Sequence, residues 1–179
     1  MNATTLSKLP ADAGTWREVE GGYEVRFERR LRHSPDKVWT AVATPEGIAR
    51  WFAVPDMEMK AGGRYDLRFA HPVSDSWAAE DAARVRPNTV RVYDPPRVFE
   101  HTFGEGNVVR WEIEPDGDGS WLVMTHFVPA GDAGSITGYL SGWTQHLRGL
   151  ETAIAGETTV WDWDAWRALK VAYDGAVEI

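Results

Sequence analysis

The stretch ITGYLSGWTQHLRGLETAI, residues Ile136 to Ile154, is the one long segment of the sequence with sustained helical periodicity. Its apolar residues recur every three or four positions and form one stripe, which consists of Ile136, Tyr139, Leu140, Trp143, Leu147, Leu150 and Ile154. At about 1.5 Å per residue, such a helix is about 28 Å long. We therefore predict a long C-terminal helix that packs its stripe against a sheet formed earlier in the chain.

The sequence before this helix predicts one strand and then two short helices. Residues 23 to 31 alternate between inward and charged positions, which is typical of a half-buried strand. Ser34 with Pro35, and Thr44 with Pro45, each combine an N-cap residue with a first-turn proline. We predict helices from Pro35 to about Ala43 and from Pro45 toward Phe52.

Further strand candidates follow at the spacing of an antiparallel meander. The glycine pair at 62 and 63 marks a turn, and strands are predicted over residues 65–69, 88–93, 97–103, 108–114 and 120–128. Connectors rich in Pro, Gly and Asp join the later strands, as expected of tight turns. Residues His71 to Arg86 break the alternation and are interpreted as a loop or a small helical insertion over Trp77 to Arg84.

The two ends of the chain differ from this central region. Residues 1–21 show little periodicity and are predicted to be a flexible leader, so that order begins near Gly22. The main domain spans 22–156, because Gly156 stands where a helix C-terminus favours glycine. The Trp-rich extension 157–179 predicts a short helix, capped by Asp162 or Asp164, that docks in cis or on a second copy in a homodimer.

Composition limits the classes of partner. The chain has 179 residues, no cysteine and a net charge of -8, which disfavours nucleic acid and anionic membrane surfaces. No run of 18 apolar residues and no signal peptide pattern is present, so we expect a soluble protein in the cytoplasm. The ten tryptophans are unusual, since Trp suits both thick cores and the walls of ligand cavities.

Several segments resemble the START-like (SRPBCC) superfamily, which has the helix-grip fold. The segments are RFERRLRHSPDKVWTAVATPEGIARWFAVP at 26–55, AGGRYDLRF at 61–69, VYDPPRVFEHTF at 92–103, WEIEPDGDGSWLVMTH at 111–126 and GWTQHLRGLE at 142–151. The branch that they resemble is that of the activator of heat-shock-protein-90 ATPase homologues. The resemblance implies an α+β fold in which a curved antiparallel sheet of about six to seven strands wraps around the long C-terminal helix.

The resemblance also implies an apolar cavity between the sheet and that helix. Projection of the strand alternation and the helix stripe onto this fold gives the predicted lining: Trp39, Trp51, Phe52, Tyr65, Leu67, Phe69, Phe99, His101, Phe103, Trp111, Ile113, Leu122, Met124, His126, Tyr139, Trp143 and Leu147. On the helix, Tyr139, Trp143 and Leu147 are predicted to face the ligand, and Leu150 and Ile154 to be plain packing.

His101 and His126 are the candidate residues for chemistry in this cavity. An imidazole in an apolar cavity can bind a polar ligand group or act as an acid or base, but it can also be a core histidine bonded to the backbone. Arg50 and Arg110 are candidates for a cavity mouth. No nucleophile motif, phosphate loop or metal spacing is present, and the carboxylates at 112, 114, 116 and 118 suit an outer strand face and a turn, so no cofactor and no metal is predicted.

Three functions remain open at this point. The leading hypothesis is a small-molecule binding protein for an apolar or aromatic ligand, in which Trp143→Ala lowers affinity. The second is a cyclase or aromatase-type enzyme that uses His101 or His126 beside Tyr139. A chaperone-partner activity follows only from the name of the branch and ranks last, because 179 residues leave no room for a separate co-chaperone domain.

Overall fold

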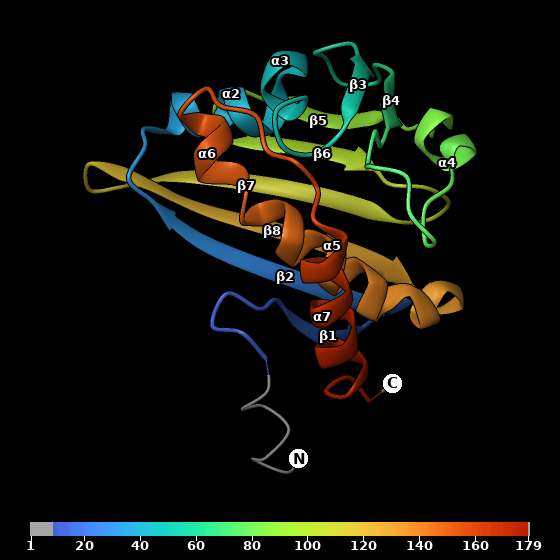
Figure 1. Ribbon diagram of the computed structural model, residues 1–179. Helices are drawn as coiled ribbons and strands as arrows, with labels where there is room; N and C mark the ends of the chain where they lie inside the picture. The colour runs from blue at the N-terminus through green and yellow to red at the C-terminus, as the bar shows by residue number, and fades with distance from the viewer. Residues whose placement is uncertain (1–8, 179) are drawn as a thin grey trace.

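A computed structural model describes residues 9–178 of the chain (Figure 1). Six antiparallel strands form one curved sheet in the spatial order β1-β2-β8-β7-β6-β5. Their bounds are β1 (Thr15–Val19), β2 (Gly22–Leu31), β5 (Val90–Asp94), β6 (Val98–Thr102), β7 (Val108–Asp116) and β8 (Gly119–Pro129). With the helices described below, this is the predicted α+β helix-grip architecture.

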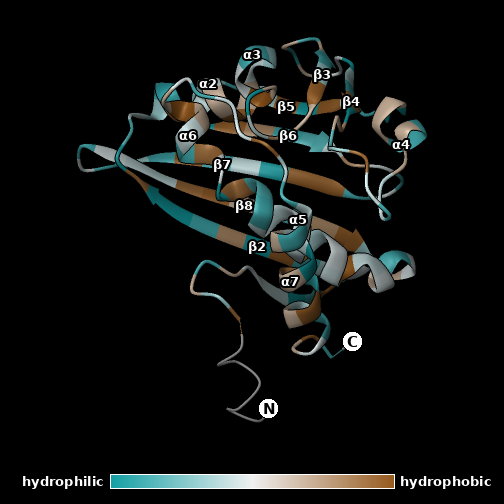
Figure 2. Ribbon diagram, in the orientation of Figure 1, coloured by the Kyte–Doolittle hydropathy of each residue, from teal (hydrophilic) through white to brown (hydrophobic). Residues whose placement is uncertain are grey.

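The register of the sheet brings the inward positions of neighbouring strands into rows. One row joins Phe27, Met124, Trp111 and Phe99, and all four side chains are buried. The helices cover this face of the sheet, and Figure 2 shows hydrophobic residues where the strands meet them. The predicted period-two alternation is therefore correct for these strands.

The helices that cover the sheet come from two parts of the chain. Two short helices, α2 (Pro35–Ala43) and α3 (Pro45–Ile48), follow β2 and both begin with proline. After β8, a 3-10 turn η1 (Ala130–Ser135) leads into α5 (Ile136–Leu147) and α6 (Leu150–Ile154). The prediction of two short helices is confirmed, although the second ends at Ile48 and does not extend to Phe52.

The long C-terminal helix is interrupted, which the stripe of apolar residues did not predict. It ends at Leu147, and α6 begins only at Leu150. A Cβ atom on Gly149 would lie 2.8 Å from the side chain of Thr159, so a glycine is needed where the following segment crosses the helix. Glycine also weakens helix propagation, and these two factors explain the break.

The N-terminal segment is more ordered than the sequence indicates. Strand β1 pairs with β2 in the register Thr15↔Arg26 to Val19↔Gly22, so order does not begin at Gly22 as predicted for a flexible leader 1–21. Gly21, with φ of 82°, makes the tight connection between the two strands. None of the five residues of β1 is fully buried, so the strand lacks the alternation of buried and exposed positions by which the other strands were recognised. Residues 1–8 of the predicted leader lie outside the described residues.

The segment between α3 and the meander forms a small structure at one end of the sheet. Strands β3 (Val54–Met57) and β4 (Tyr65–Arg68) pair with each other, and β3 was not predicted. The insertion contains the short helix α4 (Ala79–Ala83), within the predicted range 77–84. Figure 1 places β3, β4 and α4 at the β5 edge of the sheet.

The C-terminal extension docks on the same chain. Helix α7 (Trp163–Asp174) packs against α5 and buries Leu169 and Tyr173. The side chain of Asp162 caps it by accepting hydrogen bonds from the backbone N–H groups of Asp164 and Ala165. Ile179 lies outside the described residues. None of the helices in residues 9–178 combines the length and the hydropathy that a membrane crossing requires.

Candidate functional site

The predicted cavity residues do gather between the sheet and the helices. All of them are buried except Phe103 and Tyr139, which are half-buried. Their rings pack on one another: Phe52 stacks on Trp143 at a centroid distance of 4.9 Å, and Trp51 meets Trp111 edge-on at 5.9 Å. The space expected between the sheet and the middle of α5 is therefore filled by aromatic side chains.

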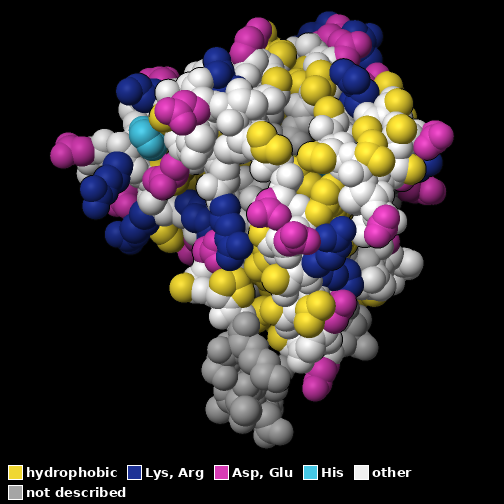
Figure 3. Space-filling view, viewed as in Figure 1, with side chains coloured by type: hydrophobic (Ala, Val, Ile, Leu, Met, Phe, Trp, Pro, Cys, Tyr) yellow, Lys and Arg dark blue, Asp and Glu magenta, His cyan; other side chains and the backbone are white. Residues whose placement is uncertain are grey.

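The main pocket lies to one side of this core. It has a volume of about 490 Å³ and is bounded by the chain just after β4, the insertion, the β6–β7 turn, α5, and the C-terminal segment through the first turns of α7. Its lining consists of Phe69, His71, Ser76, Trp77, Arg86, Asn88, Phe103, Gly104, Tyr139, Gly142, His146, Trp161, Trp163 and Trp166. On the surface around β3, β4 and α4, Figure 3 shows hydrophobic side chains grouped between charged ones.

Only a few of the predicted residues line this pocket. They are Phe69, Phe103 and Tyr139. The sequence-based prediction missed the contributions of the insertion and of the C-terminal segment, because it assigned no element to cover this edge. The one signal that could have found them is the excess of tryptophan, since Trp77, Trp161, Trp163 and Trp166 are all part of it.

A second pocket, of about 380 Å³, lies on the other side of three shared rings. Trp51 and Phe52 of the predicted set line it, together with Arg50, which was predicted at a cavity mouth. Arg110 is not at a mouth: its guanidinium is paired with Glu100 at 3.0 Å and with Glu112 at 3.2 Å, and it lines neither pocket.

The three shared rings, His71, His146 and Trp161, form a partition between the pockets. His71 stacks on Trp161 at 4.2 Å, and His146 lies 4.5 Å from Trp161. Nδ1 of His146 is 3.1 Å from the carbonyl of Trp51, so this nitrogen carries the proton and Nε2 is an acceptor. Burial lowers the pKa of His71 to about 4 and that of His146 to about 3, so both rings are neutral near pH 7.

Hydrogen bonds to two other parts of the chain hold the start of the C-terminal segment over the pocket. At the first residue of α7, the indole N–H of Trp163 donates to the carbonyl of Pro72 at 2.6 Å, and before α7 the backbone N–H of Thr159 donates to the carbonyl of Arg50 at 2.8 Å. These bonds join the segment to the loop after β4 and to the region after α3. They place the rings of residues 161, 163 and 166 at the pocket.

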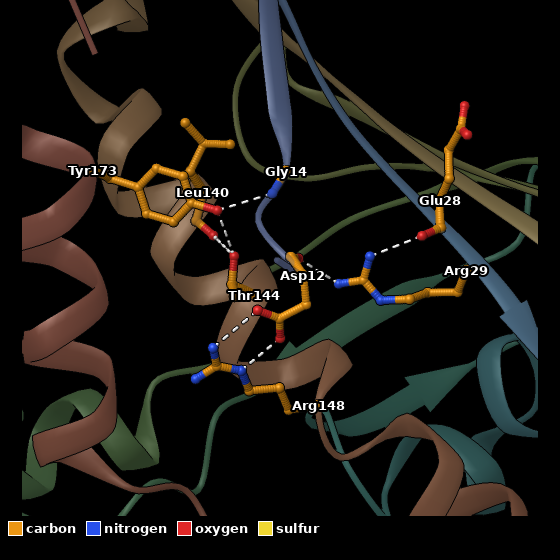
Figure 4. Close-up of polar contacts among 8 residues, drawn as sticks. All are labelled: Asp12, Gly14, Glu28, Arg29, Leu140, Thr144, Arg148 and Tyr173. Carbon is orange, nitrogen blue, oxygen red and sulfur yellow. Dashed lines mark hydrogen bonds and ion pairs between the residues drawn. The ribbon is translucent and has the colours of Figure 1, made fainter. Parts of the chain in front are cut away.

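At the other end, a polar cluster that is buried around Tyr173 and more exposed at Arg148 fixes α7 (Figure 4). The hydroxyl of Tyr173 accepts a hydrogen bond from the backbone N–H of Gly14 at 2.9 Å and lies 2.8 Å from the hydroxyl of Thr144. Close by, Arg148 makes two hydrogen bonds to the carboxylate of Asp12 at 2.7 and 3.0 Å. The cluster therefore connects α7, α5 and the chain before β1.

His101 and His126 are structural, not exposed to either pocket. They lie on β6 and β8, opposite the same residue of β7, and both are fully buried. Nδ1 of His101 donates to the carbonyl of Thr102 at 2.8 Å, and its Nε2 lies 3.4 Å from the indole N–H of Trp111. With both nitrogens engaged, His101 has no free position for acid–base chemistry.

His126 belongs to a chain of hydrogen bonds that ends at a carboxylate. The indole N–H of Trp143 donates to its Nδ1 at 3.0 Å, so Nε2 carries the proton and donates to Asn107 at 2.9 Å. Asn107 and Tyr139 both donate to Asp132, at 3.0 and 2.7 Å. Burial, together with this carboxylate, raises the pKa of Tyr139. Neither histidine is therefore available for the predicted cyclase-type reaction, and that hypothesis is withdrawn.

Unpartnered polar atoms are concentrated at the two pockets. Within residues 9–178, three buried side-chain atoms have no hydrogen-bond partner: Nε1 of Trp77, Nε1 of Trp161 and Oε1 of Gln145. Each belongs to a residue that lines a pocket. No side chain or backbone group of the described residues satisfies these three atoms, whereas buried polar groups in proteins are nearly always satisfied. In the same described part of the chain, no cluster of His, Cys, Asp or Glu is suited to a metal ion.

Comparison with known proteins identifies the family. The model of the family described as "Activator of Hsp90 ATPase homolog 1-like protein" matches residues 32–155. No curated protein matches the chain. CalU16 from Micromonospora echinospora has a similar structure, with a TM-score of 0.66 and 19% identity, over 93% of this chain and 96% of that one.

Two further solved structures are alike over nearly their whole lengths. The protein encoded by gene BPP1335 of Bordetella parapertussis has a TM-score of 0.70 and 25% identity, over 94% of this chain and 92% of that one. The conserved protein of unknown function EF2215 of Enterococcus faecalis has a TM-score of 0.72 and 14% identity, over 96% and 95%. The fold and the matched segment together show that this chain belongs to the family of Activator of Hsp90 ATPase homolog 1-like proteins.

Proposed function

We propose that this protein binds a small aromatic molecule in the 490 Å³ pocket between β4, α5 and the C-terminal segment. The observation that carries the proposal is that every unpartnered buried polar side-chain atom in residues 9–178 belongs to a pocket-lining residue. A buried group of this kind costs about 1–3 kcal/mol when it stays unsatisfied, and a polar group of a bound ligand would offset that cost. Two of the three groups, the indole N–H groups of Trp77 and Trp161, belong to residues that line this pocket, which supports a role in binding a ligand with a polar group.

The size and the lining of the pocket support a ligand of this kind. Small-molecule sites typically have volumes of about 300–1,000 Å³ and are lined by apolar and aromatic side chains with a few polar groups. Here the walls are tryptophan, phenylalanine, tyrosine and histidine rings. Flat rings favour a planar partner, because offset stacking and edge-to-face contacts add to the burial of apolar area.

Gly142 gives the pocket its depth on the α5 side. A Cβ atom on this glycine would meet no other atom within 4 Å, although Gly142 lies in the interior of the helix. The same is true of Gly138, one turn earlier, which does not line the pocket. Gly138 therefore serves as the control for Gly142, because both glycines lie in α5 and a Cβ atom meets no other atom within 4 Å at either position.

The test uses ¹⁹F NMR of protein labelled with 5-fluorotryptophan and a neutral probe, naphthalene-2-carboxamide. The resonances of Trp77, Trp161, Trp163 and Trp166 should shift on titration, whereas that of Trp121, which lies against Arg30, should stay in place. Gly142→Leu should abolish the shifts and Gly138→Leu should retain them. Equal shifts in Gly142→Leu and wild type, or no shift of the pocket resonances, would overturn the proposal.

A further inference from the structure

Arg86 is the charged residue of the pocket. Its backbone N–H donates to the carbonyl of Leu67 at 2.8 Å, and its own carbonyl accepts from Leu67 at 2.9 Å, so its position is fixed by β4. The guanidinium lies 5.3 Å from the ring centre of Phe69 and 5.2 Å from that of Trp77. Both rings line the pocket, which places the cation among the aromatic walls.

This cation has no carboxylate partner among residues 9–178. Its Nη1 donates to the carbonyls of Arg84 at 3.1 Å and of Asp81 at 3.4 Å. The carboxylate of Asp81 is engaged elsewhere: it accepts from the backbone N–H of Ala78 at 3.1 Å and pairs with Arg84 at 3.8 Å. Burial lowers the pKa of Arg86, which reflects a charge held partly out of water.

The side of the Arg86 guanidinium that carries Nε and Nη2 can bind a carboxylate through two parallel hydrogen bonds. Within the described part of the chain, Nε and Nη2 of Arg86 make no hydrogen bond to protein, whereas Nη1 makes two. A planar fork of two parallel N–H donors matches the two oxygens of a carboxylate. None of the pocket-lining residues is acidic, and the two histidines in the lining are neutral near pH 7, so no other charged group there competes for or repels an anion.

We infer that the ligand is an aromatic carboxylate, whose ring lies among the tryptophans and whose carboxylate pairs with Arg86. This inference rests on the proposed function and adds the chemical class of the ligand. A cationic aromatic molecule is disfavoured by the same guanidinium. A neutral one loses only the charge-assisted hydrogen bonds, so it binds more weakly in the same place.

The experiment compares three probes of the same shape by isothermal titration calorimetry: naphthalene-2-carboxylate, naphthalene-2-carboxamide and naphthalen-2-ylmethylammonium. Wild type should bind the acid at least about ten-fold more tightly than the amide and the ammonium least tightly. In Arg86→Gln, the preference for the acid over the amide should disappear, so that the two probes bind about equally. Arg84→Gln removes an exposed arginine two positions earlier and should preserve the full preference.

The outcomes separate the inference from the proposed function. If wild type binds the acid and the amide equally, or if Arg86→Gln keeps the preference for the acid, the inference is wrong and the aromatic pocket stands. If no probe binds, the proposed function fails and the inference fails with it. Arg86→Lys keeps the positive charge but loses the planar pair of N–H donors, and it provides the test if Arg86→Gln does not fold. The preference for the acid over the amide should fall several-fold in this variant. An undiminished preference would contradict bidentate pairing.

Discussion

Acidification should destabilise this protein chiefly through three histidines in the core, with a smaller contribution from half-buried His71. His101, His126 and His146 lie in the core, and burial lowers their pKa values to about 4, about 3 and about 3. In the unfolded chain a histidine has a pKa of about 6.5. Between these values the unfolded state binds more protons than the folded state, so the free energy of unfolding falls as the pH falls below about 6.5.

The size of the effect follows from these shifts. Proton linkage gives a loss of about 0.8 kcal/mol per histidine at pH 6.0 and about 2 kcal/mol at pH 5.0, relative to neutral pH. Three such residues amount to about 6 kcal/mol at pH 5.0, a large part of the 5–15 kcal/mol that stabilises a typical domain. At this pH most carboxyl groups are still ionised in the unfolded chain, so histidines dominate the change.

Urea unfolding followed by tryptophan fluorescence, at pH 7.5, 6.0 and 5.0, measures this effect. A double variant, His101→Gln with His126→Gln, should retain about half of the pH-dependent loss, because the imidazole of His146 and the half-buried one of His71, whose pKa is also lowered to about 4, remain. A wild-type loss below about 2 kcal/mol between pH 7.5 and 5.0 would refute the reasoning, since it would mean that the buried rings accept protons without difficulty.

Three further predictions concern packing and can be measured by urea unfolding at pH 7.5. Tyr173→Phe should lower stability by about 1–3 kcal/mol, because the buried N–H of Gly14 loses its acceptor; unchanged stability would place that N–H in contact with water. Trp143→Ala should cost about 3–5 kcal/mol, because this ring stacks on Phe52 in the core and lines neither pocket; a lower ligand affinity at full stability would contradict this. Gly47→Ala should be strongly destabilising, because the added Cβ atom would lie 1.9 Å from the carbonyl oxygen of Thr40. Gly138→Ala, where the Cβ atom meets nothing within 4 Å, should instead stabilise the protein by about 0.5–1 kcal/mol. If the two substitutions change stability equally, α3 can move away from Thr40 and the reasoning is wrong.

Most strands of the main sheet and the two short helices after β2 were predictable because their signals are local, whereas β1 and β3 were not. The alternation of residues 23 to 31 and the cap-plus-proline pairs at 34–35 and 44–45 depend only on near neighbours in the sequence. The inward side of each strand follows from the same alternation, and the burial of Phe99, Trp111 and Met124 agrees with it. Such features need no knowledge of how distant elements pack.

The position of the pocket was not predictable in this way. Whether inward rings leave a cavity depends on how they interlock, and the stacking of Phe52 on Trp143 joins elements that are far apart in sequence. The periodicity of 163–173 predicted a helix, but no local pattern indicates that it would place Trp163 beside Pro72. Arg86 is likewise one of many arginines in the sequence, and only the fold shows that it lies among aromatic rings without an acidic partner in the described residues.

The partition of His71, His146 and Trp161 has a thermodynamic consequence for the two pockets. Each ring faces both spaces, so any displacement of Trp161 that enlarges one pocket reduces or reshapes the other. Two molecules bound on opposite sides would then change each other's affinity, and the change must be the same factor in both directions. A single molecule long enough to displace Trp161 would instead occupy both pockets at once and prevent two separate molecules from binding.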